Sequence, residues 1–91
     1  MNDEEVLKAI KLRYKELREK TGLKQVDFAN KFNLDRQQVN NWESFKSTRG
    51  VSVYTISSFC KLVEIDLREF FDSPLFGEDK KKDKSQKKKK D

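Results

Sequence analysis

The residues with the most specific hydrogen-bonding chemistry follow one another within one short stretch of the chain. At about 100° per residue, a helix over residues 36–44 would gather them in one sector, namely Arg36, Gln37, Asn40, Asn41 and Ser44. The opposite sector would hold Gln38, Val39 and Trp42. The first sector contains neutral or basic groups and no carboxylate, as a helix that faces a polyanion requires.

The side chains of this sector match the edges of DNA bases. Arginine donates a bidentate pair to O6 and N7 of guanine, and asparagine or glutamine bonds N6 and N7 of adenine. The residues that suit this major-groove code are Arg36, Gln37, Asn40 and Asn41. A solvated helix face without a ligand is the alternative, because most surface helices carry a polar face. The segment that precedes the sector favours base reading.

That preceding segment predicts a short amphipathic helix that ends at a sharp corner. Val26, Phe28, Ala29 and Phe32 recur at helical spacing. The small side chain of Ala29 leaves room for a second helix to cross closely. Asn33 is expected to end the helix, because asparagine tolerates the left-handed conformation of a sharp exit.

A second helix is expected to start directly after the corner. Leu34 would lie beneath the corner, and Asp35 would accept hydrogen bonds from the free amides of the new helix. With Gln38 three residues later, Asp35 would make a capping box. Two helices joined by a turn of about three or four residues follow the plan of the helix-turn-helix motif, here residues 25–44.

From about Leu17 to Phe71 the chain resembles the Cro and lambda-repressor type of helix-turn-helix proteins, also called the xenobiotic-response-element family. Members usually show an LRxxxGLxQxxLA run, a Gly-hydrophobic corner, a β-branched residue followed by a hydrophobe in the recognition helix, and a closing Glu. The matching residues are Leu17, Arg18, Gly22, Leu23, Gln25, Phe28, Ala29, Leu34, Val39, Trp42 and Glu43. The resemblance implies an all-α, five-helix, lambda-repressor-like DNA-binding domain.

The resemblance also implies roles for single residues. Arg36, Gln37 and Asn41 match the usual base-reading positions, with Asn40 and Ser44 close to bases or backbone. Other positions have different expected roles. Residues expected at the DNA phosphates are Gln25, Ser44, Lys46 and Arg49.

Three further expectations come from positions that match the family pattern or differ from it. Gln25 would also brace Arg36, and Arg18 and Glu43 would form a buried ion pair. Lys24 replaces the usual Ser or Thr cap, which predicts a weakly capped helix start. Two other departures from the pattern are Asn33 and Phe45, each at a position where Gly is common.

The remaining elements are predicted from spacing and caps. A helix over residues 3–20 would face the core with Val6, Ile10, Tyr14 and Leu17. Ser52 would cap a fourth helix whose inner stripe is Val53, Ile56, Phe59, Cys60 and Val63. Asp66 and Glu69 would make a capping box for a fifth helix over residues 67–72, which Pro74 ends.

An apolar cluster closes the folded part of the chain, with Phe70, Phe71, Leu75 and Phe76. Part of the cluster, Leu67 together with Phe70 or Phe71, is expected to close the core. A domain this small cannot bury every member, and an apolar patch left exposed would indicate a partner surface. The cluster is therefore a possible dimer surface.

Charge is distributed unevenly along the 91 residues. Residues 78–91 hold eight Lys and four acidic residues, whereas residues 11–49 hold ten basic and five acidic ones. We therefore predict a DNA-binding domain over residues 1–77, followed by a disordered Lys-rich tail over residues 78–91. The tail is either a solubilising end or a sequence-independent attraction to nucleic acid.

Several classes of protein are not expected from this composition. The chain has no His and a single Cys, Cys60, so a metal site or a nucleophile-base pair lacks its usual residues. We expect no enzyme activity, no metal and no cofactor. The acidic N-terminus and the lack of a long apolar run predict no leader and no membrane span. A lone Cys fits a reducing cytoplasm, where it would be a core residue.

The sequence thus predicts a sequence-specific regulator of transcription that binds double-stranded DNA. The preferred interpretation is a bacterial or phage-encoded repressor that is cytoplasmic and nucleoid-associated. It would act as a homodimer and place residues 36–44 in the major groove. The alternative is a protein-interaction module, such as an antitoxin or a bridging coactivator, that uses its apolar end at residues 70–76.

Overall fold

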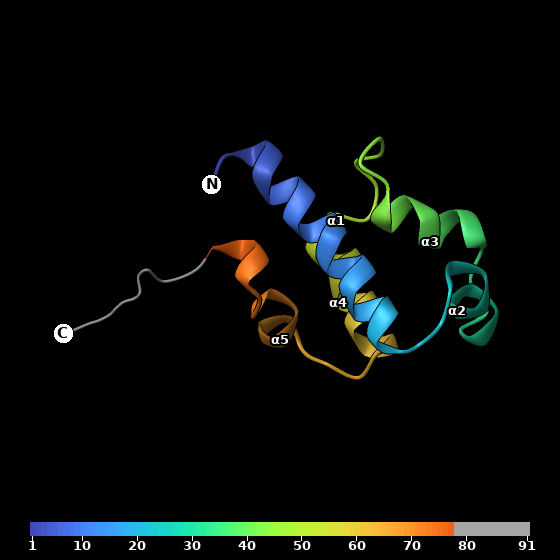
Figure 1. Ribbon diagram of the computed structural model, residues 1–91. Helices are drawn as coiled ribbons and strands as arrows, with labels where there is room; N and C mark the ends of the chain where they lie inside the picture. The colour runs from blue at the N-terminus through green and yellow to red at the C-terminus, as the bar shows by residue number, and fades with distance from the viewer. Residues whose placement is uncertain (78–91) are drawn as a thin grey trace.

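The structure is a computed structural model that describes residues 1–77, and the predicted Lys-rich tail, residues 78–91, lies outside this part. Residues 1–77 form five α-helices and one 3-10 turn, with no strand among them (Figure 1). In chain order these are α1 (Asp3–Lys20), α2 (Gln25–Lys31), α3 (Arg36–Glu43), α4 (Val53–Leu62), α5 (Leu67–Phe71) and η1 (Pro74–Phe76). The all-α, five-helix prediction is confirmed for these residues.

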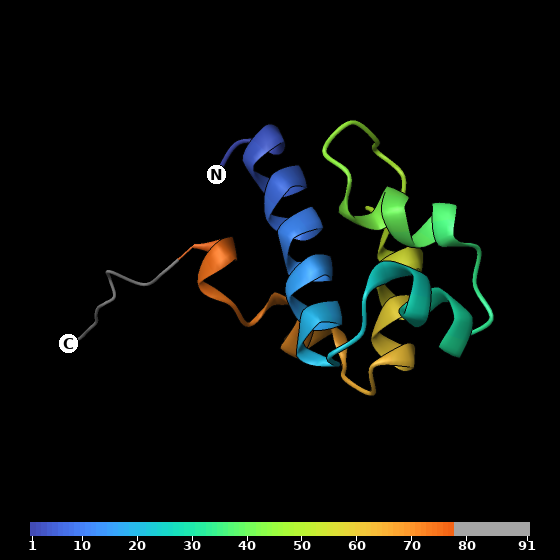
Figure 2. The ribbon, with the colours of Figure 1, turned by 45° about the vertical axis from the view of Figure 1, so that its right-hand side comes forward.

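The helices surround one core, and α1 is the longest of them. In both views, α2 and α3 lie on one side of α1, and η1 lies on the other side near the N-terminus (Figures 1 and 2). The start of α1 and the end of the described chain therefore lie away from α3. No helix within residues 1–77 is both long enough and apolar enough to cross a membrane.

Tyr14 of α1 lies at the centre of an aromatic core. Its ring stacks on Trp42 of α3, with 5.6 Å between the centroids, and meets Phe59 of α4 edge to face at 4.9 Å. Phe70 of α5 completes the group at 5.4 Å from Tyr14. Four helices thus converge on one side chain, and α3 is fixed to the core through Trp42. Cys60 is buried in the same core, as predicted.

Helix boundaries follow local caps. The Ser52 hydroxyl accepts from the Thr55 amide, so the predicted cap of α4 is confirmed. At α5 the Asp66 carboxylate accepts from the Glu69 amide, but the return bond from Glu69 that a capping box needs is absent. Lys24 gives α2 no side-chain cap, also as predicted. At α1, Asn2 and Glu5 make a reciprocal capping box that sequence reasoning missed.

Four apolar residues that looked like core residues are exposed. They are Val6, Val26, Val53 and Leu67, and the most exposed is Val53 at 63%. Each lies within the first turn of its helix, and in α1 and α4 the buried stripe begins one turn later, at Ile10 and Ile56. The apolar periodicity of the sequence includes the first turn of these helices, but no other part of residues 1–77 covers that turn.

The predicted dimer surface needs a correction at Phe70. This side chain is 0% exposed and belongs to the core, so it cannot contribute to a partner surface. The reason is that its ring packs edge to face against Tyr14 and Phe59, with 5.4 Å and 6.2 Å between the centroids. Arg13 of α1 holds α5 in this place through a hydrogen bond of 2.7 Å from its Nε to the Phe70 carbonyl. Phe71 stays 40% exposed, while Leu75 and Phe76 are half-buried.

Candidate nucleic-acid interface

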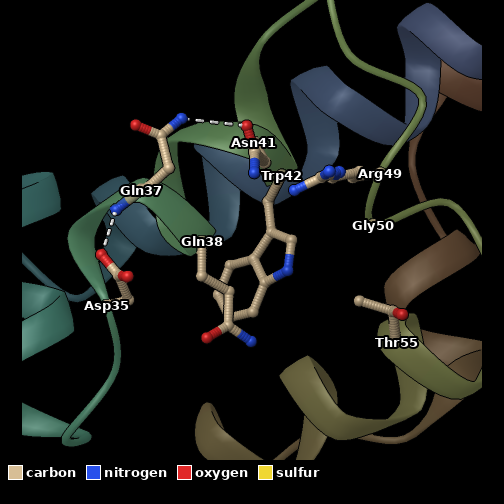
Figure 3. A pocket seen from close by; sticks show the side chains of 8 residues that line it. All are labelled: Asp35, Gln37, Gln38, Asn41, Trp42, Arg49, Gly50 and Thr55. Carbon is tan, nitrogen blue, oxygen red and sulfur yellow. Dashed lines mark hydrogen bonds between the residues drawn. The ribbon is translucent and has the colours of Figure 1, made fainter.

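The exposed sector of α3 is the one that the sequence predicts, with one addition. Arg36, Gln37 and Asn40 are exposed and Asn41 is half-buried, while Val39 and Trp42 face the core. Gln37 Nε2 donates to Asn41 Oδ1 at 3.2 Å, so the two amides are aligned along the helix (Figure 3). The sector therefore presents one guanidinium and three carboxamides.

The addition is Gln38, which the sequence placed on the inner side of α3. It is exposed, and its side chain lies beside the indole of Trp42 at the edge of the sector (Figure 3). The expected capping box is also absent from α3, since the Asp35 carboxylate accepts from the Gln37 amide at 2.9 Å. The side-chain carboxamide of Gln38 therefore takes no part in the cap of α3.

The corner between α2 and α3 has the predicted conformation. Asn33 adopts a left-handed φ of 57°, which asparagine tolerates better than most side chains. The Leu34 amide donates to the Ala29 carbonyl at 2.7 Å and closes the end of α2. The corner thus sets the direction in which α3 leaves α2.

A buried ion pair joins α3 to α1. Arg18 Nε donates to Glu43 Oε2 at 2.6 Å, and Arg18 Nη2 donates to Glu43 Oε1 at 3.1 Å. The hydrogen bonds that Arg18 donates to Glu43 raise the pKa of its guanidinium above the ordinary value. The pair that the resemblance implied is present, and it fixes the last turn of α3.

Gln25 has a different partner from the expected one. Its Nε2 donates to Glu43 Oε1 at 3.1 Å, so it supports the ion pair, and the expected brace to Arg36 does not form. Glu43 ends α3, whereas Arg36 begins it. The Glu43 carboxylate is the strongest acceptor within reach, which explains the choice. One amide hydrogen of Gln25 remains for another acceptor.

Lys11 of α1 is a second anchor, which sequence reasoning missed. It is 0% exposed, and its Nζ donates to the Asn41 carbonyl at 2.5 Å and to the Arg49 carbonyl. Burial lowers the pKa of its ammonium group. The sequence held one sign that Lys11 is buried, because Lys11 lies next to Ile10 and three residues before Tyr14, at the border of the apolar stripe.

The loop over residues 44–52 lies against α3 and forms a hollow with it. Residues that line the hollow come from α3, the loop and the start of α4, and they are Asp35, Gln37, Gln38, Asn41, Trp42, Arg49, Gly50 and Thr55 (Figure 3). The Arg49 side chain extends toward Asn41. The hollow is therefore bordered by base-reading candidates on one side and by a phosphate candidate on the other.

Two other phosphate candidates lie at the start of this loop. Lys46 is exposed, and its amide donates to Ser44 Oγ at 3.2 Å. Ser44 is half-buried and is the C-cap residue that follows α3. Its hydroxyl thus shapes the loop, and its hydrogen remains available for donation to a phosphate oxygen.

Gly50 holds the loop close to the core. Its φ is 88°, and a Cβ built on it would lie 2.6 Å from Trp42 Cδ1. The Tyr14 hydroxyl donates to the Gly50 carbonyl. Only glycine combines this conformation with this approach.

The exposed charged residues within residues 11–49 are mostly basic. Lys11, Arg13 and Arg18 are buried, so they cannot attract a phosphate. The exposed basic residues within residues 11–49 are Lys15, Lys20, Lys24, Lys31, Arg36, Lys46 and Arg49. The exposed acidic residues in the same range are Glu19, Asp27 and Asp35. The surface excess therefore favours an anionic partner.

Comparison with known proteins provides no relative from which a role could be transferred. No family model, curated protein or solved structure matches the chain. Within residues 1–77, no group of three or more acidic, His or Cys side chains is arranged to hold a metal ion. The functional interpretation therefore depends on α3 and on the residues that hold it.

Proposed function

We propose that the protein binds double-stranded DNA sequence-specifically, as a helix-turn-helix regulator of transcription of the lambda-repressor type. The observation that carries the proposal is the exposed sector of α3, which offers Arg36, Gln37, Asn40 and Asn41 without a carboxylate. The opposite side of the same helix is buried through Val39 and Trp42. A helix anchored in this way presents a rigid row of donors and acceptors, as base reading requires.

In this proposal α3 lies in the major groove, and its outward side chains contact base edges. Arg36 reads guanine through a bidentate contact, and the carboxamides of Gln37, Asn40 and Asn41 read adenine. The hydrogen bond between Gln37 and Asn41 orients both amides before DNA arrives. Orientation in advance lowers the entropy lost on binding.

Phosphate contacts would position the domain on the duplex. Lys46 and Arg49 lie in the loop beside α3, where they can reach one DNA strand while α3 lies in the groove. Gln25 and Ser44 retain one donor hydrogen each for the same strand. Such contacts carry no sequence information, so they add affinity and fix the register.

Repression would follow from occupation of a promoter by a homodimer. Two-fold pairing would place the two α3 helices about 34–36 Å apart, over a near-palindromic site. The competing role, a protein-interaction module at residues 70–76, is weakened because Phe70 is buried and Phe76 packs on it with 6.2 Å between the ring centroids. Phe71 is the member of that cluster that remains exposed within the described residues.

Selection of bound sequences from a random duplex pool tests the proposal. Wild type is compared at near-physiological salt with the Arg36→Ala, Asn41→Ala double variant. The matched control is Arg68→Ala, which removes the same charge as Arg36→Ala from α5, apart from α3 in both views. Each good base contact contributes about 1–3 kcal/mol of discrimination, so the double variant should lose preference by roughly 10-fold or more.

The outcomes separate the two functions. A near-palindromic site that the control variant retains and the double variant loses supports a dimeric sequence reader. Binding that responds only to salt and shows no sequence preference in wild type would refute the proposal. Co-purification of a stable protein partner that Phe71→Ser releases would then favour the interaction module.

A further inference from the structure

A buried ammonium group joins the two parts of the surface that the proposed function uses. Lys11 lies 30 residues before Asn41 and 38 residues before Arg49, and its Nζ donates to the main-chain carbonyls of both. Asn41 is a base-reading candidate on α3, and Arg49 is a phosphate candidate in the loop. One side chain therefore links these two segments directly.

The two carbonyls need such a donor. Asn41 belongs to the last turn of α3, where carbonyls have no intrahelical partner because the helix ends at Glu43. Arg49 lies in the loop, and its own amide donates to Ser47 Oγ. An ammonium group has three hydrogens and can serve both carbonyls at once, which a neutral apolar side chain of the same length cannot do.

Burial makes Lys11 depend on its two carbonyl acceptors. Burying an ammonium group is costly unless hydrogen bonds compensate for the lost water, so Lys11 stays in place only while both carbonyls do. The neighbouring Tyr14 hydroxyl donates to the Gly50 carbonyl, one residue after Arg49. Lys11 and Tyr14 thus form two adjacent contacts between α1 and the same loop.

We propose that Lys11 is a positioning residue that sets the relative placement of Asn41 and Arg49 on DNA. The proposal rests on the proposed function for its role in binding, but its structural half is independent of DNA. Lys11 has no exposed surface, so it cannot contact a phosphate itself. Any effect of its replacement on DNA binding therefore passes through α3 and the loop.

Hydrogen exchange tests the structural half without DNA. In Lys11→Met, the hydrogen-bonded amides of the loop, those of Lys46, Ser47 and Arg49, should exchange at least about 10-fold faster, because the loop loses its anchor. Amides of α2 should keep their wild-type rates. The matched control is Lys15→Met, which removes the same charge from an exposed position on α1 and should leave the loop unchanged.

The salt dependence of DNA binding tests the functional half. Each phosphate contact contributes about 0.9 to the slope of log affinity against log salt, so Lys11→Met should reduce the slope by about one contact although Lys11 is buried. It should also relax the preference at the base that Asn41 reads. Arg49→Ala should reduce the slope in wild type and change it little further in the Lys11→Met background.

The results separate this proposal from the proposed function. If wild type shows no sequence preference, the proposed function fails, and unchanged exchange in the loop of Lys11→Met would overturn the role of Lys11 as well. If wild type selects a sequence and Lys11→Met keeps the salt slope, the preference and the exchange rates, the positioning role alone is overturned. If Lys11→Met does not fold, Lys11→Gln is used, since it retains a polar end but is one atom shorter. The same changes, smaller in size, are expected there, and wild-type values would overturn the role.

Discussion

Arg18 and Glu43 form a bidentate ion pair across the interface between α1 and α3, with side chains that are only 9% and 6% exposed. Gln25 donates to the same carboxylate. Arg18 also donates from Nη1 to the Leu23 carbonyl at 2.6 Å, between α1 and α2. Helices α1, α2 and α3 are therefore joined through one buried charge pair.

Removal of one partner of this pair should be severe. Glu43→Ala leaves the Arg18 guanidinium buried without a counter-charge, and the free energy of unfolding should fall by about 3–5 kcal/mol. Urea unfolding measures the change. Glu16→Ala is the control, because the Glu16 side chain is 44% exposed and the buried Arg13 guanidinium keeps its hydrogen bonds to the Phe70 and Glu69 carbonyls. Its loss should be about 1 kcal/mol or less. Equal losses in the two variants would contradict the special role of the buried pair.

A side chain at Gly50 should destabilise the loop on two grounds. The added Cβ would lie 2.6 Å from Trp42 Cδ1, and the φ of 88° disfavours any side chain. Gly50→Ala should therefore cost about 2 kcal/mol or more in thermal unfolding. Gly22→Ala has a similar φ of 82° but meets no atom within 4 Å, so it isolates the conformational part, about 1 kcal/mol. If Gly22→Ala is as damaging as Gly50→Ala, the close approach to Trp42 is unimportant.

Binding titrations at several salt concentrations should distinguish base contacts from phosphate contacts. Lys46→Ala should lower the slope of log affinity against log salt by about 0.9 and leave the selected sequence unchanged. Gln37→Ala removes no charge, so it should leave the slope unchanged and relax one or two base positions. If Lys46→Ala selects a different sequence, Lys46 contacts bases and not the phosphate backbone.

Alkaline pH should report on Tyr14. Burial, with a smaller contribution from Cys60, raises the pKa of Tyr14 above its ordinary value of about 10. Above that ordinary pKa the unfolded chain loses the phenolic proton while the folded chain keeps it, so the folded state binds more protons. The free energy of unfolding therefore falls as pH rises, by at most about 1.4 kcal/mol per pH unit for this group.

Tyr14→Phe removes this titration together with the bond to Gly50. The variant should be less stable than wild type at neutral pH, and the difference should shrink above about pH 10. Urea unfolding between neutral and alkaline pH measures the two curves. Tyr54→Phe is the control, since Tyr54 is 86% exposed, and its curve should run parallel to wild type. Parallel curves for Tyr14→Phe would contradict a buried, protonated Tyr14.

Much of the local structure was predictable because it depends on neighbours in sequence. The predicted helix over residues 3–20 has those bounds in the structure. The corner at Asn33 and the cap at Ser52 are also as predicted, and Asp66 makes its half of the predicted capping box. Each is governed by one side chain and the amides of the next turn, which the sequence specifies directly.

The sequence by itself determined which residues of α3 carry hydrogen-bonding chemistry and which carry the apolar stripe, because helical periodicity separates the two sectors. It did not determine how far each stripe is covered, so Val53 and Leu67, both expected in the core, are exposed. Only the tertiary structure showed that Lys11 is buried and that Gln25 binds Glu43. The physical reason is that a buried polar group depends on acceptors from distant segments, here the Asn41 and Arg49 carbonyls. No local spacing encodes where those carbonyls lie once α1, α3 and the loop have packed.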